Sequence, residues 1–412
     1  MILQKEREIL RELAQQQLEA ACSEKNRKRV ELWKRHNDGR GERPLIHLEI
    51  DTFENELLPK RMRCETPLAR ELEFALYKNF LNFTVLDDDW VVPDYFPVAW
   101  RTYFQPFGHP VTATFASNAD SVSVGHRFNY LIEDLEEDWE KLKPSRYGVD
   151  REATQAYFDA AQDAFGDLLP ARMVMHCLTA VPTQDVVHLM GMETMCFSMY
   201  DYPELFHKLM DRLADDYLAY FDFLRREGLL LPTTGFEGLG QGSRCFTSEL
   251  PSETVNGPGD VWGFMDSQET VSISPDMYGE FIFPYYRKIA EKFGLLSYGC
   301  CEPVDKVWDY VGAFKNLRKV SCSPWCDEAF MAERLRGKRI IFHRKPSPNF
   351  LGVDKQLDEQ AFREHIRNTL TAAKGCTLEI TQRDVYTIHN DEEKAKSYVA
   401  IIREEIENHW EP

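Results

Sequence analysis

The sequence lacks the features of a membrane or exported protein. No apolar run approaches the roughly 18 residues that a spanning helix needs, and the amino-terminal residues carry charge within the first five positions. Ten cysteines in 412 residues are too sparse for a disulfide scaffold, so we interpret them as reduced thiols. These absences predict a cytoplasmic protein without a membrane anchor or an export signal.

Basic residues are in short supply. The chain has 49 Lys and Arg against 68 Asp and Glu, a net charge of −19, which repels phosphate backbones and anionic membrane surfaces. We therefore expect no nucleic acid and no membrane as partner. Glycine and proline (22 and 21) are near ordinary usage and 43% of the residues are apolar, which is typical of a globular chain with a large core.

Nucleotide-binding motifs are also missing. Four short β-type runs, 296–301, 317–322, 338–343 and 376–381, are each followed by a helical pattern. Such alternation allows either a doubly wound sheet or a closed (β/α)8 barrel. Because no Gly-x-Gly-x-x-Gly follows a strand and no Walker motif occurs, the α/β class with a TIM barrel is favoured.

The amino terminus has a different pattern. Apolar residues recur at helical spacing between charges over residues 1–36, and residues 37–44 break the pattern before an apolar run at 45–50. We predict a helical arm over residues 1–42 and a barrel over 43–412. The arm either packs by one stripe or joins a homodimer.

Chemistry-bearing residues gather at the four strand ends, where active sites of α/β folds form. The ends carry thiols, an imidazole, carboxylates and cations, in the segments 298–303, 321–327, 343–346 and 381–384. Thiolate, imidazole and carboxylate are zinc ligands, but no Cys-x-x-Cys pair is present. Cys300 and Cys301 are adjacent and point to opposite faces of a strand. His343, Cys322 and Cys376 fit equally well as core residues.

Two further segments carry acids. Asp87–Asp89 offers a carboxylate for acid–base work or for a cationic group, or is a surface turn. Asp185 and His188 are similar to the cobalt-ligating Asp-x-His-x-x-Gly loop of corrinoid-binding modules, but one extra residue separates them. We infer that the chain does not itself bind a corrinoid.

Several motifs, taken in order, resemble the uroporphyrinogen decarboxylase superfamily. They are Met175–Thr179, Gly191–Glu193, Tyr202–Met210, Trp262–Glu269, Ser274–Tyr278 and Pro284–Tyr285. The likeness spans roughly residues 80–408 and implies a (β/α)8 barrel. That superfamily includes the haem-pathway decarboxylase and methyltransferases that work with corrinoid proteins.

The resemblance implies a ligand set as well. The decarboxylase's amino-terminal Arg-Gln-x-Gly-Arg segment has no counterpart near residues 47–51, which disfavours that enzyme. In the methyltransferases a His-x-Cys and a later Cys hold zinc, and the likeness places Cys300 and Glu302 at the first two positions and Asp384 near the third. One sulfur and two carboxylates make a harder site than the family's.

The expected function is therefore a methyltransferase that moves a methyl group between a small methylated compound and a separate corrinoid protein, with zinc as a possible aid. Catalytic roles are expected for Asp266, Glu302 and Asp384, and metal binding for Cys300, Glu302 and Asp384. Substrate-binding residues are expected to be Asp87, Tyr298, Trp325, His343, Arg344 and Lys345.

Two alternatives stay open. In a cofactor-independent decarboxylase, Arg344, Lys345 and Arg383 would hold a carboxylate while Asp266 or Asp87 protonates a carbanion. In a non-catalytic barrel, changes at the strand ends would alter stability alone. Dependence on a corrinoid partner separates the first alternative from the methyltransferase.

Overall fold

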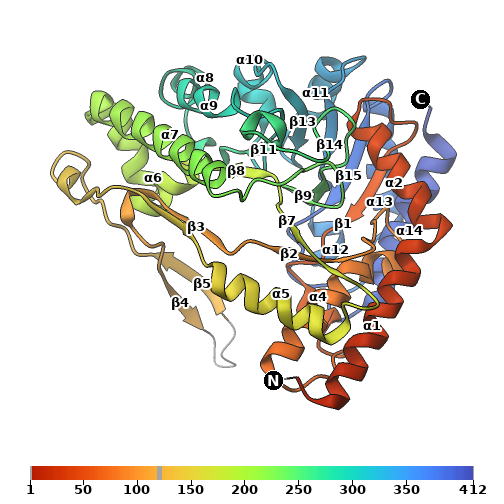
Figure 1. The fold of residues 1–412 in the computed structure, drawn as a ribbon. Coiled ribbons are helices and arrows are strands. Elements are labelled where there is room, and N and C mark those ends of the chain that lie inside the picture. Colours follow the sequence, from red (N-terminus) through yellow and green to blue (C-terminus); the bar gives the residue numbers. More distant parts are fainter. Residues whose placement is uncertain (1, 118–122, 412) are drawn as a thin grey trace.

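The computed structural model describes residues 2–117 and 123–411. Seven parallel strands form its main sheet (Figure 1). In order across the sheet they are β1 (Leu45–Leu48), β15 (Leu378–Gln382), β14 (Ile341–Arg344), β13 (Leu317–Cys322), β12 (Leu295–Tyr298), β11 (Trp262–Met265) and β8 (Leu178–Ala180). Most of their residues are buried, which is typical of parallel sheets covered on both faces.

Helices alternate with these strands, as the sequence predicted. The α-helices are α1 (Gln4–Cys22), α2 (Glu24–Asn37), α3 (Glu54–Leu57), α4 (Pro67–Leu81), α5 (Arg151–Phe165), α6 (Pro182–Asp201), α7 (Pro203–Arg226), α8 (Pro275–Met277), α9 (Phe283–Ala290), α10 (Trp308–Val311), α11 (Glu328–Leu335), α12 (Asn349–Gly352), α13 (Glu359–Ala372) and α14 (Glu392–His409). In Figure 1, α9, α10 and α11 lie above the sheet, and α1, α4 and α5 lie below it.

The predicted closed barrel is not found as such. Within the described residues the two edge strands, β1 and β8, do not pair with each other. β2 (Phe96–Ala99) and β7 (Ala171–Val174) form a separate parallel pair, and β7 lies in the chain just before β8. The coarser prediction, an α/β fold around a parallel sheet, is confirmed.

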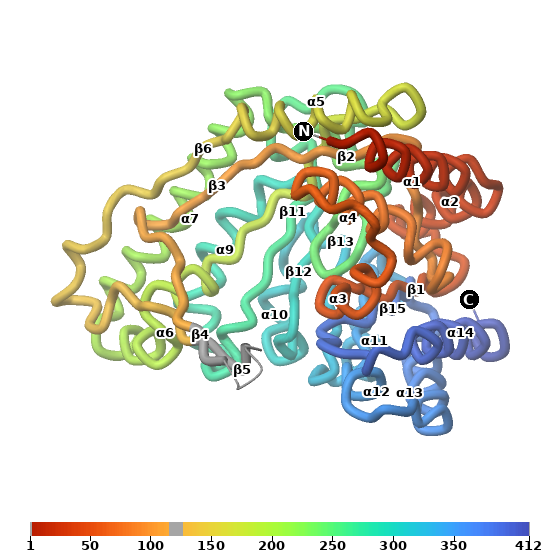
Figure 2. The backbone as a smooth tube through the Cα atoms, turned by 90° about the horizontal axis from the view of Figure 1, so that it is seen from below, coloured from red at the N-terminus to blue at the C-terminus, as the bar shows by residue number. Residues whose placement is uncertain are grey.

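Three antiparallel pairs complete the strands. They are β3 (Thr102–Gln105) with β6 (Arg146–Val149), β4 (Ala113–Ser117) with β5 (Ser123–Phe128), and β9 (Gly238–Leu239) with β10 (Ser243–Arg244). Figure 2 shows the first two pairs on the side of the molecule away from α14. The β3–β6 and β4–β5 pairs are therefore peripheral to the parallel sheet.

Side chains bridge the gap between β1 and the segment that leads into β2. The backbone N–H of Ile46 donates to Asp89 Oδ2 at 2.9 Å, and that of Leu48 to Asp88 Oδ2 at 3.0 Å. Asn82 Nδ2 donates to the carbonyl of Leu48 at 2.8 Å. One backbone hydrogen bond, from Asp89 N to Ile46 O at 2.8 Å, accompanies them. We call this contact between β1 and residues 82–89 the seam.

The amino-terminal arm is two helices, not one. Ser23 separates α1 from α2, and its hydroxyl accepts the N–H of Asn26 at 3.1 Å, which caps the second helix. Leu10 and Leu13 are buried in a cluster with residues of α4 and α5. The arm is therefore packed onto the rest of the chain.

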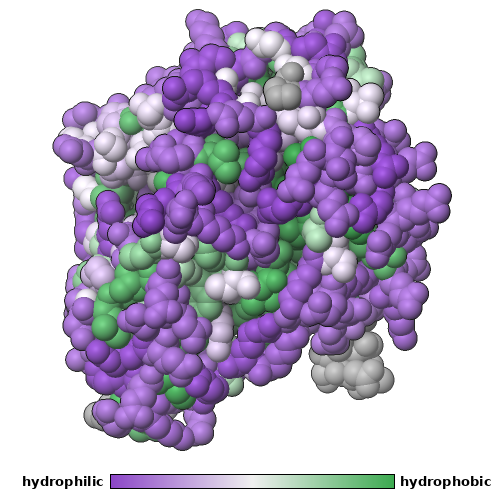
Figure 3. All heavy atoms as spheres, turned by 90° about the vertical axis from the view of Figure 1, so that its right-hand side faces the viewer, coloured by the Kyte–Doolittle hydropathy of each residue, from purple (hydrophilic) through white to green (hydrophobic). Residues whose placement is uncertain are grey.

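Element boundaries differ from the sequence predictions by a few residues. The run at 317–322 is strand β13 as predicted, whereas the run at 338–343 begins later, as β14. The final helix is capped by Asp391, whose side chain accepts the N–H of Lys394 at 3.1 Å. None of the described helices combines the length and apolar character needed to cross a membrane. Figure 3 shows a mostly hydrophilic surface with a band of apolar atoms across its middle.

Candidate functional site

The carboxyl ends of the parallel strands bring a set of reactive side chains together. We call this set the strand-end cluster; it consists of Asp266, Cys300, Cys301, Glu302, Lys345, Arg383 and Asp384. Neighbouring strands place their ends side by side: the N–H of Gly299 donates to Met265 O at 2.8 Å, and that of Lys345 to Cys322 O at 2.9 Å. Residues far apart in sequence thus meet because the strands are parallel.

Glu302 is fixed by the backbone on both sides. Its Oε1 accepts the N–H of Ser267 at 3.0 Å and its Oε2 accepts the N–H of Cys300 at 2.8 Å. The residue is buried, with 3% of its surface exposed. Glu302 therefore ties the end of β12 to the end of β11 and has each carboxylate oxygen already engaged.

The two adjacent cysteines divide their contacts. Cys300 Sγ lies 3.5 Å from Cys301 Sγ, and Cys301 Sγ lies 3.7 Å from Asp384 Oδ2. The hydrogen bond between the two thiols raises the pKa of Cys300, and burial raises it further. The same hydrogen bond lowers the pKa of Cys301. Cys301 is therefore the more acidic thiol and the one that faces Asp384.

The three residues expected to bind zinc are not arranged as a ligand set. Glu302 has both oxygens bonded to backbone N–H groups, and Asp384 meets Cys301 in place of Cys300. Over residues 2–117 and 123–411, no group of three or more His, Cys, Asp or Glu side chains is placed to hold a metal ion. The cluster as it stands does not fit zinc.

Asp266 is the unusual acid of the cluster. It follows β11, is 4% exposed, and its Oδ1 has no hydrogen-bond partner. Burial raises its pKa well above the usual 3.8, and the neighbouring Glu302 and Cys300 raise it further. The carboxyl group is therefore protonated at a pH where an exposed aspartate is charged, and it can donate a proton.

Two cations of the cluster converge on one neutral oxygen. Lys345 Nζ and Arg383 Nη1 both donate to Gln241 Oε1, the latter at 2.5 Å. Arg383 Nε also pairs with Glu49 Oε2 at 2.7 Å. Burial lowers the pKa of Lys345. Gln241 is the tip of the β9–β10 hairpin, and sequence reasoning missed it.

Glycines let the hairpin tip enter among the strands. A Cβ on Gly240 would lie 2.5 Å from the ring of Phe264, and one on Gly242 would lie 2.9 Å from Thr381 Cγ2. Gly242 also has φ +80°, a conformation that favours glycine. The run Gly238–Ser243, Gly-Leu-Gly-Gln-Gly-Ser, is the sequence signal that could have indicated this close approach.

Several expected site residues lie outside the cluster. Asp87 pairs with Lys25 at 2.5 Å and with Arg29 at 2.6 Å, so it is a structural acid next to α2. Arg344 Nε pairs with Glu328 of α11 at 2.6 Å. Neither Asp87 nor Arg344 is thus placed to bind a substrate beside Asp266.

The other expected substrate-binding residues are near the cluster but engaged or displaced. Tyr298 is fully buried, and its hydroxyl is 2.7 Å from that of Ser267. His343 Nε2 is 2.8 Å from Thr381 Oγ1, and burial lowers the pKa of His343 well below its usual 6.5. Trp325 is largely exposed on the loop after β13. Of the six expected substrate-binding residues, Lys345 alone is a member of the cluster.

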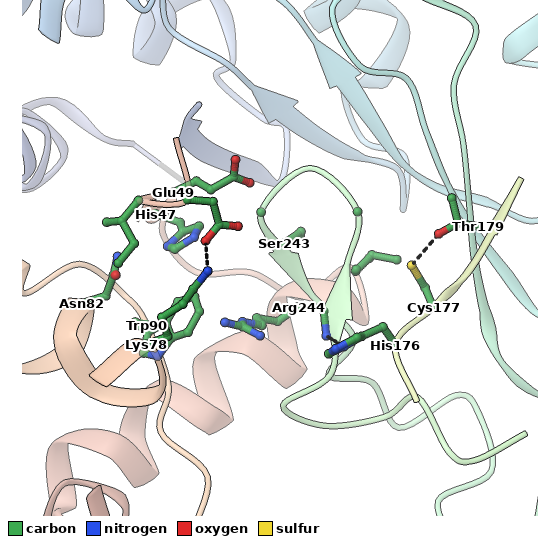
Figure 4. A pocket seen from close by; sticks show the side chains of 16 residues that line it. His47, Glu49, Lys78, Asn82, Trp90, His176, Cys177, Thr179, Ser243 and Arg244 are labelled. Carbon is green, nitrogen blue, oxygen red and sulfur yellow. Dashed lines mark hydrogen bonds and ion pairs between the residues drawn. The ribbon is translucent and has the colours of Figure 1, made fainter. Parts of the chain in front are cut away.

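A cleft adjoins the cluster. A cavity of about 320 Å³ is lined by residues from β1, α4, the segment that leads into β8, and the β9–β10 hairpin (Figure 4). Labelled among them are His47, Glu49, Lys78, Asn82, Trp90, His176, Cys177, Thr179, Ser243 and Arg244. Glu49 belongs to the cleft and also pairs with Arg383, so cluster and cleft are neighbours.

Comparisons with known proteins add a distant structural likeness. No protein-family model matches the chain, and no curated protein matches it. Among solved structures, a methyltransferase from Methanosarcina mazei is similar with 12% identity and a TM-score of 0.49, over 91% of this chain and 97% of that one. A likeness this distant identifies neither a substrate nor any acting residue.

Proposed function

We propose that the protein is a methyltransferase that moves a methyl group between a small methylated compound and a separate corrinoid protein. The motif resemblance in residues 175–285 supports this class. The observation that carries the proposal is Asp266, a buried carboxyl group at a strand end whose Oδ1 has no hydrogen-bond partner. Methyl transfer away from oxygen or nitrogen needs such a proton donor.

The chemistry assigned to this chain is protonation and positioning. The partner's corrinoid, when bound, supplies a reduced cobalt nucleophile that takes the methyl group. As the carbon–oxygen or carbon–nitrogen bond breaks, its electron pair stays on the leaving atom, which takes the proton of Asp266. Glu302 fixes the loops on either side through the N–H groups of Ser267 and Cys300. No step passes through zinc.

We also propose that the chain is a (β/α)8 barrel interrupted at the seam. In this description the barrel has eight strands. After β1 comes β2, then β7 and β8 counted together as one strand because they follow one another in the chain. The other five strands are β11–β15. The parallel pairing of β2 with β7 and the hydrogen bonds across the seam support this arrangement.

A decarboxylase is the second candidate, and one observation favours it. Lys345 and Arg383 both point to the uncharged oxygen of Gln241. A substrate carboxylate in that place would meet two cations. Loss of carbon dioxide would leave an electron pair on carbon, and Asp266 would protonate it.

The experiment combines the protein with a reduced corrinoid protein and candidate methyl ethers, methylamines or methyl thiols. Loss of the Co(I) absorbance reports transfer. Asp266→Asn should slow it about 10²- to 10⁴-fold, which is the usual contribution of a general acid. The matched control is Asp276→Asn, an exposed acid in α8, which should act at the wild-type rate.

The pH dependence tests the same residue. Because burial raises the pKa of Asp266 well above 3.8, activity should fall as the pH rises through that raised pKa, at a higher pH than an exposed aspartate would give. If no donor changes the Co(I) absorbance while a carboxylated substrate releases carbon dioxide without corrinoid, the decarboxylase replaces the methyltransferase.

A further inference from the structure

Arg244 occupies an unusual position in the cleft. It ends strand β10, and its guanidinium lies over the ring of Trp90, 3.6 Å from the ring centroid. Nη1 donates to the carbonyl of Phe236 at 2.9 Å, whereas Nε is buried without a hydrogen-bond partner. Figure 4 shows the side chain reaching from the hairpin between His176 and Lys78. The aromatic face thus holds the guanidinium in the wall of the cavity.

The guanidinium has no counterion in the described part of the chain. No carboxylate there lies within 4.0 Å of Arg244, whereas Arg318, Arg344 and Arg383 pair with glutamates at 2.6–2.8 Å. Burial lowers the pKa of Arg244 to about 10. A desolvated cation without a partner is costly, so this group favours an incoming anion.

The acids that line the cleft do not form an ion pair with Arg244. Asp51 pairs with Lys78 at 2.5 Å, and Glu49 pairs with Arg383 at 2.7 Å. Each of these carboxylates already has a cation closer than Arg244. Asp88 and Glu237 also act on the Arg244 charge, but from beyond ion-pair distance. No carboxylate in the described part of the chain therefore neutralises Arg244 by direct contact.

A second donor faces the same cavity. The N–H of Gly238 donates to His176 Nδ1 at 2.9 Å, so the proton of the neutral imidazole is on Nε2. The side chain of His176 is exposed to the cleft. Ile50 and Leu239 supply apolar wall. A cation, a neutral donor and apolar surface together suit a carboxylate with a compact apolar body.

We propose that the cleft is a binding site for a small carboxylate with an apolar body, anchored on Arg244. The anchor stands at the base of the β9–β10 hairpin, whereas Gln241 at its tip contacts the strand-end cluster. The site is thus distinct from the protonating acid Asp266. The proposal is independent of the reaction proposed above, because it concerns binding to this chain alone.

Calorimetric titration with benzoate tests the charge requirement, and benzamide is the neutral control of the same shape. Benzoate should bind the wild-type protein at least about tenfold more tightly than benzamide, and Arg244→Gln should remove that preference. Arg172→Gln is the matched control, because Arg172 also stacks on an aromatic ring, that of Tyr95 at 5.0 Å, yet is exposed. It should leave benzoate affinity unchanged.

A measurement on the wild-type protein keeps the test decisive if Arg244→Gln does not fold. Phenylglyoxal modifies guanidinium groups, and peptide mass spectrometry locates the modified arginines. Benzoate should slow modification of Arg244 and not of Arg172, and inorganic phosphate at equal concentration should protect Arg244 less. Equal binding of benzamide and benzoate, equal protection by phosphate, or no protection at Arg244 would each overturn the proposal.

Discussion

The carboxylate of Asp89 should be one of the larger single contributions to stability. Its two oxygens accept two hydrogen bonds from Arg43, both at 2.8 Å, and Oδ2 also accepts the N–H of Ile46 across the seam. The side chain is 1% exposed. Arg43 and the neighbouring arginines lower the pKa of Asp89 from 3.8 to about 2, against the opposing effect of burial.

The magnitude follows from that pKa. One pKa unit corresponds to about 1.36 kcal/mol, so the charged form of Asp89 stabilises the fold by about 2 kcal/mol at pH 7. A lowered pKa gives stability that is complete above the unfolded value and is lost as the pH falls through the folded one. Near pH 3, between 3.8 and about 2, roughly half should remain.

Asp89→Asn tests this reasoning. The variant should lose about 2 kcal/mol of unfolding free energy at pH 7 and about half of that near pH 3, measured by urea unfolding followed by circular dichroism. Asp87→Asn is the control: its side chain is 61% exposed although it pairs with Lys25 and Arg29, so it should cost less than about 1 kcal/mol. A loss at Asp89 that is no larger than at Asp87, or that does not shrink in acid, would refute the argument.

Two further predictions concern the interior. Lys319→Met should cost about 3–5 kcal/mol in urea unfolding, because Lys319 and Glu379 are ion-paired and fully buried. The glutamate would keep only the imidazoles of His36 and His343, each 3.5 Å away. Adding Glu379→Gln should recover part of the loss, and no recovery would contradict a charge effect. Gly242→Ala should lower the melting temperature more than Gly337→Ala. Both glycines have positive φ, so the backbone strain is shared. A Cβ on Gly242 would lie 2.9 Å from Thr381, whereas one on Gly337 would meet nothing within 4 Å. Equal shifts would show that space at the hairpin tip is unimportant.

The local sequence pattern was enough to predict that strands alternate with helices and that reactive groups gather at the ends of strands. The run at 317–322 is strand β13 as predicted, with all six residues buried, and the expected site residues Cys300, Glu302 and Asp384 follow the ends of strands. The β9 and β10 strands have two residues each, too short for any periodicity. Their role depends on distant partners, Lys345 and Arg383, which a single sequence does not pair with Gln241.

The expected zinc ligands show that spacing along the sequence does not predict the direction of a side chain. The positions of Cys300, Glu302 and Asp384 at strand ends were sufficient to bring them near one another, but not to set the direction of each side chain. Backbone N–H groups engage both oxygens of Glu302, and Cys301 takes the place beside Asp384. Such choices depend on loop geometry of about an ångström, which composition does not encode.

The seam makes part of the fold unusually dependent on residue identity. An ordinary β ladder uses backbone groups that every residue except proline supplies, so it survives most substitutions. Here the N–H groups of Ile46 and Leu48 are met by the side chains of Asp89 and Asp88, and the carbonyl of Leu48 by Asn82. A substitution at any of these three positions would remove a hydrogen bond between β1 and residues 82–89, so this edge tolerates fewer substitutions than a backbone ladder would.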